Sequence, residues 1–516
     1  MTFNPIIKYC IIFISAISSI IYCSILCSGS IIQHFIEFLF GKTKFKPIDY
    51  ETKDHSYIPR KAFEDLENMK PSANLEYYIQ HLNLELEEYK VTTIDGFILT
   101  LHRIINPKED KGAQFNRKPV LLQHGLLSCS GTFIASGQNS LGFYLFEQGF
   151  DVWLGNNRSW FKAEHQTLKN LYNNEEYWNW SVPQLAYFDL PSIIETILSI
   201  NKTHKKLILI GHSQGGLQSF LMLKNPEFSH IHEKIELFIP IAPAIYPGSL
   251  FYKRYFLIII CHFNKLAWIL VFGICAMLRN LCLMRNSLCE WKPFGYLSYY
   301  MFKYLFGWTC RNWGSSSKVH HFLFIFNMSY VSVELMKYYL GKFKPEGFVK
   351  MLHLKSDYKT GDNYAINPKN PIDDSNSYFP YKKSWFDHLN VPVLVVIGEE
   401  DYLVDGKKLV THMTNYEHNY KQNVNLFIVE VATYNHLDVV WAEDLIGTIG
   451  FKTMKVYEQL QAQDKQETEV VDEKTQSIIE EDTAKNSNDT ELNEKPTPLP
   501  IDIPKDENNN QSVLVY

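Results

Sequence analysis

The chain has 516 residues, of which 46% are hydrophobic and 15% aromatic, so it can form one large core and carry extra segments. Its formal net charge of −6 is uneven, because residues 461–516 hold 14 acidic and 5 basic side chains, a net −9, and the remainder carries +3. Neither part shows a basic stripe interleaved with aromatic residues, so we exclude a nucleic-acid-binding protein from the expected classes.

The cysteines indicate a reducing compartment. There are nine, an odd number, most of them in apolar surroundings and none in a C-x-x-C pair. This pattern favours free structural thiols over a disulfide framework or a zinc site. We therefore expect no metal, and a folded domain on the cytosolic face of a membrane.

Residues 1–47 are expected to form a hydrophobic membrane anchor. No charged residue lies between Lys8 and His34, and a bilayer-spanning helix needs only ~20 apolar residues. The Ser28–Gly29–Ser30 segment lies between two apolar arms, which leaves two forms open: a single span, or a hairpin that enters one leaflet and returns. A cleaved signal peptide is the competing interpretation, although these three residues make a weak cleavage site.

A linker and then a folded domain are expected after the anchor. Residues 48–74 are polar and contain Pro59 and Pro71, which predicts the linker. The domain is expected over residues 75–460 and opens with E-Y-K-V-T-T-I-D-G-F-I-L-T-L-H-R, residues 88–103. Alternating apolar residues on both sides of an Asp-Gly pair predict a β-hairpin.

Two further apolar runs predict buried strands. Residues 119–122 (P-V-L-L) lead into Q-H-G-L-L, and residues 150–154 (F-D-V-W-L) lead into G-N-N-R. We expect His124, in the first of these loops, to brace the loop rather than to take part in chemistry.

The stretch K-L-I-L-I-G-H-S-Q-G-G, residues 206–216, contains a candidate nucleophile. A buried strand runs into the G-x-S-x-G pentapeptide, and a helix-compatible segment follows. A serine on such a strand-to-helix turn has a strained backbone and an exposed hydroxyl, and glycines two residues to either side leave room for it. Ser213 is the predicted nucleophile, and the backbone N–H groups of Gln214 and Leu126 are the predicted oxyanion donors.

Four motifs together resemble the acid lipase family, which includes gastric and lysosomal lipases and the sterol ester hydrolases of yeasts. They are L-Q-H-G-L-L, G-F-D-V-W-L-G-N-N-R, Y-F-D-L-P and G-H-S-Q-G, in this order and at similar spacing. The resemblance extends from about residue 75 to residue 457. The apolar start and the lack of a disulfide pattern make the chain most similar to the yeast sterol ester hydrolases.

This resemblance implies an α/β-hydrolase fold, with a mostly parallel central sheet and flanking helices, a Ser–Asp–His triad, carboxylic-ester hydrolysis and no cofactor. The implied substrate is a sterol ester, with triacylglycerol as the alternative. The implied location is a lipid droplet or the endoplasmic reticulum membrane. An acyltransferase would use the same triad, and a catalytically inactive hydrolase fold could serve as a tether at a lipid surface.

Residues 245–385 lack the regularly spaced strand-like segments of the rest of the domain and are expected to form a large helical cap. Residues 255–278 are strongly apolar, and residues 296–313 are rich in aromatic side chains. A second membrane span over residues 255–278 is disfavoured, because it would separate strands of one sheet. An apolar cap suits a lipid acyl chain or a sterol, although the same composition also fits ordinary packing.

The other two triad members are sought after the last strands, because the fold has the chain order Ser, Asp or Glu, His. The strand P-V-L-V-V-I, residues 392–397, ends at G-E-E-D-Y-L-V-D. Asp401 matches the acid position of the family, and Asp405 matches a second aspartate in the same motif and remains the alternative. An apolar run over residues 426–431 predicts the last strand, and His436, in the N-H-L-D segment that follows it, matches the catalytic histidine. We expect His212, His412 and His418 to be structural or surface residues, and Asp438 to serve packing or loop hydrogen bonding.

Residues 461–516 are acidic and contain P-T-P-L-P, which predicts a disordered tail. The domain also contains four N-x-S/T sequences, which would contradict a cytosolic location if they were glycosylated. Their asparagines are Asn157, Asn179, Asn201 and Asn327.

Overall fold

The computed structural model describes residues 4–41, 56–353 and 375–466. The chain divides into two compact units, Met1–Val456 and Tyr457–Tyr516, and the described residues of the second unit, 457–466, are helical. The expectation of disorder is therefore wrong for residues 461–466, whose Gln, Ala, Asp and Lys side chains tolerate a helix without Gly or Pro. The rest of the expected tail, residues 467–516, lies outside the described residues.

An eight-stranded, mostly parallel sheet forms the centre of the first unit, which confirms the expected fold class. The strand order is β1-β2-β4-β3-β5-β6-β7-β8; β1 and β2 form a hairpin, β2 pairs antiparallel with β4, and all other pairs are parallel. The strands are β1 (Glu85–Thr92), β2 (Ile98–Ile105), β3 (Pro119–Gln123), β4 (Asp151–Gly155), β5 (Leu207–His212), β6 (Ile235–Ile241), β7 (Val393–Gly398) and β8 (Leu426–Val431).

The predicted strands occur where the sequence places them. Strands β3, β4 and β5 are buried along their whole length, as continuous apolar runs in a parallel sheet should be. In the β1–β2 hairpin Thr92 pairs with Ile98, and Asp95–Gly96 lies in the turn. Gly96 has a φ of 86°, a value that glycine adopts without a Cβ clash.

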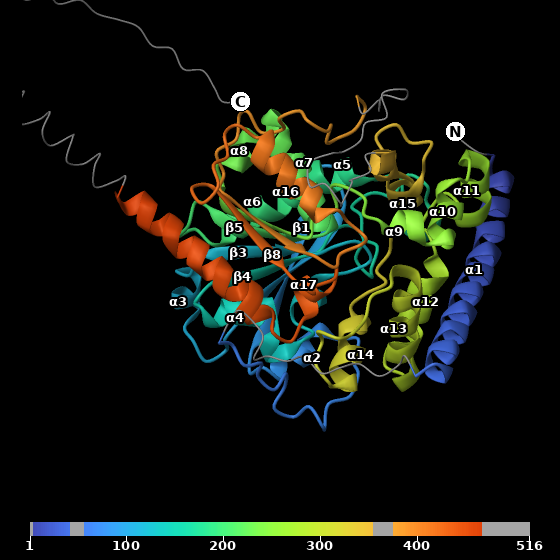
Figure 1. Ribbon diagram of the computed structural model, residues 1–516, viewed down its shortest axis with the longest axis horizontal. Helices are drawn as coiled ribbons and strands as arrows, with labels where there is room; N and C mark the ends of the chain where they lie inside the picture. The colour runs from blue at the N-terminus through green and yellow to red at the C-terminus, as the bar shows by residue number, and fades with distance from the viewer. Residues whose placement is uncertain (1–3, 42–55, 354–374, 467–516) are drawn as a thin grey trace, which may run out of the picture. The chain divides into compact units, whose positions relative to one another are not determined.

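Helices flank the sheet (Figure 1). Outside the cap they are α2 (Leu75–Gln80), α3 (Lys111–Phe115), α4 (Leu141–Glu147), α5 (Val182–Gln184), α6 (Leu190–Ile200), α7 (Gln214–Lys224), α8 (Ser229–His232), α16 (Gly406–Asn415) and α17 (Asp438–Trp441). Helix α7 begins directly at the end of β5 and packs against both β5 and β6. This arrangement fixes the turn that carries the candidate nucleophile.

A helical cap lies between β6 and β7, as expected. Its helices are α9 (Leu250–Lys253), α10 (Tyr255–Cys261), α11 (Lys265–Phe272), α12 (Arg279–Leu288), α13 (Lys292–Phe306), α14 (Ser317–Ile325) and α15 (Val333–Leu340). Helices α10 and α11 cover most of the apolar stretch and are bent by 117° at the break between them. Residues 354–374, also assigned to the cap, lie outside the described residues.

The apolar N-terminus forms α1 (Pro5–Leu39), one continuous helix of 35 residues that is long and apolar enough to cross a membrane. The hairpin alternative is therefore wrong. Ser28, Gly29 and Ser30 continue the helix, and the Ser30 hydroxyl donates to the Cys27 carbonyl oxygen at 2.8 Å. Serine satisfies its hydroxyl within a helix in this way, so a Ser-Gly-Ser segment need not break one.

The expected linker is wrong for residues 56–74, which pack on the domain. Phe63 and Met69 are buried, and the Phe63 ring lies 6.1 Å from the Tyr78 ring and 6.0 Å from the Phe322 ring. The segment is polar on average, so its composition does not indicate that a few of its apolar side chains are buried. Residues 48–55 lie outside the described residues.

Candidate active site

The candidate residues meet at the carboxyl ends of the parallel strands. The loop after β3 carries Leu126, the turn after β5 carries Ser213, and the loops after β7 and β8 carry Asp401 and His436. Because these strands are neighbours in the sheet, with only β6 intervening, their carboxyl ends lie at the same edge. Ligand sites of open α/β sheets form at this edge.

The turn at Ser213 has the strained geometry expected of a nucleophile elbow. Ser213 has φ 52° and ψ −111°, a conformation that costs a non-glycine residue about 1–3 kcal/mol. The flanking glycines are required by space. A Cβ on Gly211 would lie 2.7 Å from the backbone of Gly215, and a Cβ on Gly215 would lie 2.3 Å from the Gln123 carbonyl oxygen.

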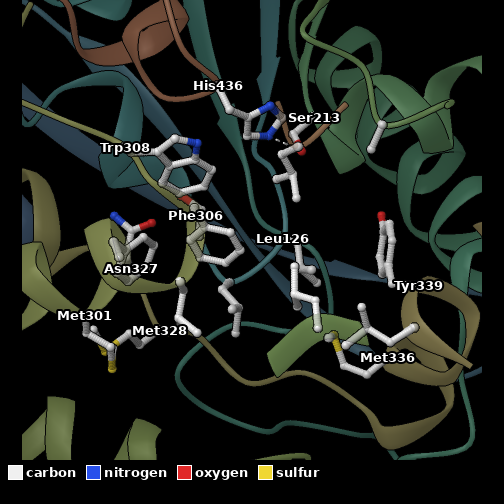
Figure 2. Close-up of a pocket in the computed structure, with 18 of the residues that line it drawn as sticks. Leu126, Ser213, Met301, Phe306, Trp308, Asn327, Met328, Met336, Tyr339 and His436 are labelled. Carbon is white, nitrogen blue, oxygen red and sulfur yellow. Dashed lines mark hydrogen bonds between the residues drawn. The ribbon is translucent and has the colours of Figure 1, made fainter. Parts of the chain in front are cut away.

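Ser213, His436 and Asp401 form a hydrogen-bonded chain. The distance from Ser213 Oγ to His436 Nε2 is 2.9 Å, drawn as a dashed line in Figure 2, and His436 Nδ1 lies 2.6 Å from Asp401 Oδ2. The other carboxylate oxygen of Asp401 accepts the N–H groups of Leu403 and Val404 at 2.9 and 3.1 Å. An ionised Asp401 therefore holds the proton of His436 on Nδ1, which leaves Nε2 free to accept the serine proton.

The two other aspartates near His436 have different partners. Asp405 caps α16, because its Oδ1 accepts the N–H of Lys408 at 3.0 Å. Asp438 accepts the backbone N–H of Asn435 and the side chains of Asn312 and Trp313, all within 2.8 Å, and burial raises its pKa to about 7. It ties the histidine loop to the cap, which confirms its expected hydrogen-bonding role.

The two predicted oxyanion donors flank Ser213. Gln214 is the first residue of α7, and Leu126 follows Gly125, at which a Cβ would lie 3.1 Å from the Ser213 Cβ. Within the described residues neither N–H donates to a protein acceptor. Two unused N–H donors beside a serine hydroxyl, one of them at a helix start, can stabilise a developing oxyanion.

The neighbouring histidines are structural, as expected. His124 Nε2 accepts the N–H of Asn157 at 3.2 Å and its Nδ1 lies 2.7 Å from the Gly125 carbonyl oxygen; burial lowers its pKa to about 4. His212 Nε2 lies 3.1 Å from the carbonyl oxygen of His436, and burial lowers its pKa to about 3. Both rings are therefore neutral at pH 7.

The other two histidines named from the sequence also lie outside the site. His412 is buried and bonds Glu417 at 2.8 Å, and His418 is exposed. Among the described residues no cluster of three or more His, Cys, Asp or Glu side chains could hold a metal ion.

A largely apolar cavity of about 180 Å³ extends from Ser213 and His436 into the cap (Figure 2). Its walls come from the Leu126 loop, from α10, α13 and α15, and from the segment after α13. Trp308 stacks on the His436 ring, with centroids 5.7 Å apart and an interplanar angle of 17°. The cavity can hold an apolar chain whose reacting carbonyl lies next to Ser213.

The sequence did not predict the role of Trp308, nor the buried ion pairs that Arg158 forms with Asp95 and Asp189. Arg158 donates two hydrogen bonds to Asp95 and three to Asp189, at 2.7–3.0 Å, and its guanidinium lies 3.8 Å from the centre of the Phe97 ring. Two of these residues were visible in the G-N-N-R and Y-F-D-L-P motifs. Nothing in the aromatic-rich cap sequence distinguishes Trp308 from its neighbours.

Comparison with known proteins gives matches over most of the chain. A family model described as a partial alpha/beta-hydrolase lipase region matches residues 75–137, and one described as the alpha/beta hydrolase fold matches residues 118–230. Sterol esterase 2 of Saccharomyces cerevisiae is 32% identical over 419 residues, which cover 76% of this chain and 74% of that protein.

A second relative and a solved structure are also similar to the chain. Gastric triacylglycerol lipase of Bos taurus is 30% identical over 390 residues, covering 73% of this chain and 89% of that protein. The crystal structure of a carboxylesterase from Bacillus subtilis is 12% identical, covers 72% of this chain and 93% of its own, and has a TM-score of 0.37.

Proposed function

Since the chain belongs to the acid lipase family of α/β-hydrolases, we propose that it hydrolyses sterol esters at a membrane or lipid-droplet surface through Ser213, His436 and Asp401. Carboxylic-ester hydrolysis by a serine hydrolase is the activity of this family, and its substrates are hydrophobic. The observation that carries the proposal is the hydrogen-bonded chain of these three side chains, of which Ser213 and His436 line an apolar cavity.

In the proposed mechanism Ser213 Oγ attacks the ester carbonyl carbon while His436 Nε2 takes the hydroxyl proton. The N–H groups of Gln214 and Leu126 stabilise the oxyanion, and His436 then returns the proton to the departing alcohol. Water repeats the sequence on the acyl-enzyme, which releases the fatty acid and restores the serine. Asp401 holds the histidine tautomer and stabilises the imidazolium.

The proposed sterol ester preference is supported by the name of the yeast relative, whereas the bovine relative is named for triacylglycerol. The lining of the cavity is compatible with either substrate. Its volume of about 180 Å³ is below the ~300–1,000 Å³ of typical ligand sites. We therefore propose that the cap helices shift when a whole ester binds.

The proposed membrane location is supported by the side chains of α1. Its large exposed side chains are apolar along the whole helix, with Ser24 and Ser28 as polar exceptions, whereas four of its six buried residues are small. This is the reverse of a helix on a water-soluble surface. Two observations support the proposal that the domain lies on the cytosolic face. All nine cysteines are free thiols, and three of the four asparagines in the N-x-S/T sequences of the domain are buried, with only Asn179 exposed.

The test is ester hydrolysis by the purified full-length protein in detergent micelles, with cholesteryl oleate and trioleoylglycerol as substrates. Ser213→Ala should reduce the rate by about 10⁴–10⁶-fold, whereas Ser199→Ala, an exposed serine on α6, should not change it. Activity confined to trioleoylglycerol would retain the mechanism and replace the substrate.

Two controls separate the remaining alternatives. Product ester formed when a free sterol and an acyl donor are supplied would indicate an acyltransferase. A folded protein that hydrolyses neither ester, and whose Ser213 fails to react with a fluorophosphonate probe, would refute the enzyme and favour the lipid-surface tether.

A further inference from the structure

The cavity beside Ser213 has a wall that comes from outside the hydrolase domain. Tyr22 and Leu26 of the N-terminal helix α1 line the same cavity as Ser213 and His436. In α10 and α13 the cavity is lined by Phe256, Leu257, Met301 and Phe302, among others. The helix expected only to anchor the protein therefore also encloses the space in which the substrate would lie.

Helix α1 lies against the cap along most of its length (Figure 1). Its buried positions follow one stripe at spacings of three or four residues: Ile11, Ser15, Ser19, Cys23, Leu26 and Ser30. Four of the six are small, which lets helices approach closely. At two points the space is too small for a Cβ: one on Gly273 would lie 2.6 Å from Ser15 Oγ, and one on Gly29 would lie 2.9 Å from the Tyr304 ring.

Specific contacts hold α1 in register on the cap. Asn280 Nδ2 of α12 donates to the Ala16 carbonyl oxygen at 3.0 Å, and Lys303 of α13 forms an ion pair with Glu37. The Tyr22 ring lies 5.2 Å from the Phe256 ring and 5.9 Å from the Phe272 ring. These contacts in the middle of the helix and near its C-terminal end fix which of its side chains reach the cavity.

Leu26, which belongs to the buried stripe, and the adjacent Ile25, which does not, have opposite environments. Leu26 is 4% exposed and lines the cavity, whereas Ile25 is 61% exposed on the outward apolar face. The two side chains have the same volume and occupy consecutive positions in the helix. They therefore form a matched pair for testing the role of the inward face.

We propose that α1 forms part of the acyl-chain site, with Leu26 and Tyr22 determining which acyl lengths the enzyme accepts. This inference rests on the proposed ester hydrolysis and assigns part of its specificity to the anchor helix. A flexible acyl chain can adapt to a cavity of only about 180 Å³, whereas a rigid sterol cannot, so we assign the acyl part of the ester to the space beside α1.

The first test compares Leu26→Trp with Ile25→Trp in the full-length protein, using p-nitrophenyl butyrate and p-nitrophenyl palmitate. A tryptophan at position 26 fills the cavity, so the ratio of kcat/KM for palmitate to that for butyrate should fall by about tenfold or more. Ile25→Trp should keep the wild-type ratio. An unchanged ratio in Leu26→Trp, in protein whose Ser213 still reacts with a small fluorophosphonate, would overturn the proposal.

The second test leaves the pocket unaltered, so it does not depend on the folding of a variant. A p-nitrophenyl alkylphosphonate with a diazirine near the end of its chain is attached to Ser213 and irradiated. Mass spectrometry should then find the Ser213 peptide joined to α1 at or near Tyr22 and Leu26. Crosslinks confined to the cap helices would overturn the proposal. Failure of the proposed function itself would appear differently, as a wild-type protein that neither hydrolyses butyrate nor reacts with the phosphonate.

Discussion

The replacement of Asp401 by asparagine tests the geometry of the triad. Asp401 Oδ1 accepts the N–H groups of Leu403 and Val404 at 2.9 and 3.1 Å, and Oδ2 lies 2.6 Å from His436 Nδ1. In Asp401→Asn the two N–H donors should hold the amide oxygen, so the amide NH₂ group turns toward His436. The histidine must then accept at Nδ1 and carry its proton on Nε2, where it cannot take the proton of Ser213.

We expect kcat for p-nitrophenyl butyrate to fall by about 10⁴-fold, the cost of the wrong tautomer in a serine triad, which corresponds to about 5.4 kcal/mol of transition-state stabilisation. The change is isosteric and keeps the two backbone hydrogen bonds, so Tm should change little. The rate at which a fluorophosphonate labels Ser213 should fall in parallel with kcat.

Asp405→Asn is the matched control, because asparagine and aspartate cap helices about equally well. Asp405 caps α16 through the N–H of Lys408 and does not contact His436, so this variant should keep its kcat. The reasoning would be refuted if Asp405→Asn lost activity as Asp401→Asn is expected to, or if Asp401→Asn kept more than a few per cent of the wild-type rate.

Three further predictions concern folding and pH. Gly215→Ala would place a Cβ 2.3 Å from the Gln123 carbonyl oxygen, so we expect the free energy of unfolding to fall by about 1–3 kcal/mol and Ser213 to be displaced. Differential scanning fluorimetry and the rate of Ser213 labelling measure these two effects. Gly112→Ala is the control, because its Cβ would meet only the movable Asp110 side chain, at 2.9 Å. Arg158→Met would leave the buried carboxylate of Asp189 without its cation, so the free energy of unfolding in urea should fall by about 3–5 kcal/mol. Adding Asp189→Asn should recover part of this loss. Equal stability of the single and the double variant would contradict the prediction. Burial lowers the pKa of His124 to about 4 and of His212 to about 3, so below pH ~6.5 the unfolded chain binds protons that the native state does not. Tm should therefore fall as the pH falls from about 6.5 to about 4, and the fall should be steeper in the wild type than in His212→Gln. Equal slopes of Tm against pH in the two proteins would show that His212 does not contribute.

The strands and the elbow could be predicted because their signals are local. A buried parallel strand needs a short apolar run, and the turn at Ser213 needs glycines at 211 and 215 because the backbone leaves no room for a Cβ there. His436 could be located because the order of strands and loops along the chain is a property of the fold. The helical cap could be predicted because a long interval without strand-like segments separates β6 from β7.

The errors and omissions concern contacts between distant segments. The polar composition of residues 56–74 predicts a linker, although Phe63 packs on Tyr78 and Phe322. The Ser-Gly-Ser sequence is compatible with a hairpin, whereas in the structure it continues the single helix α1. Trp308 stacks on His436 from a position more than a hundred residues away in the sequence. Composition averages over neighbours in the chain and carries no information about neighbours in space.

The class of the fold, the strained serine and the order of its partners can therefore be inferred from the sequence, because they depend on backbone sterics and apolar periodicity within short segments. The choice between Asp401 and Asp405 requires the folded structure, because the two residues follow the same strand four residues apart and have the same chemistry. The loop after β8 brings His436 within 2.6 Å of Asp401, while Asp405 is occupied at the start of α16. The tertiary structure likewise decided that α1 reaches the cavity, since Leu26 and Ile25 are both apolar and only packing against the cap determines which of them faces inward.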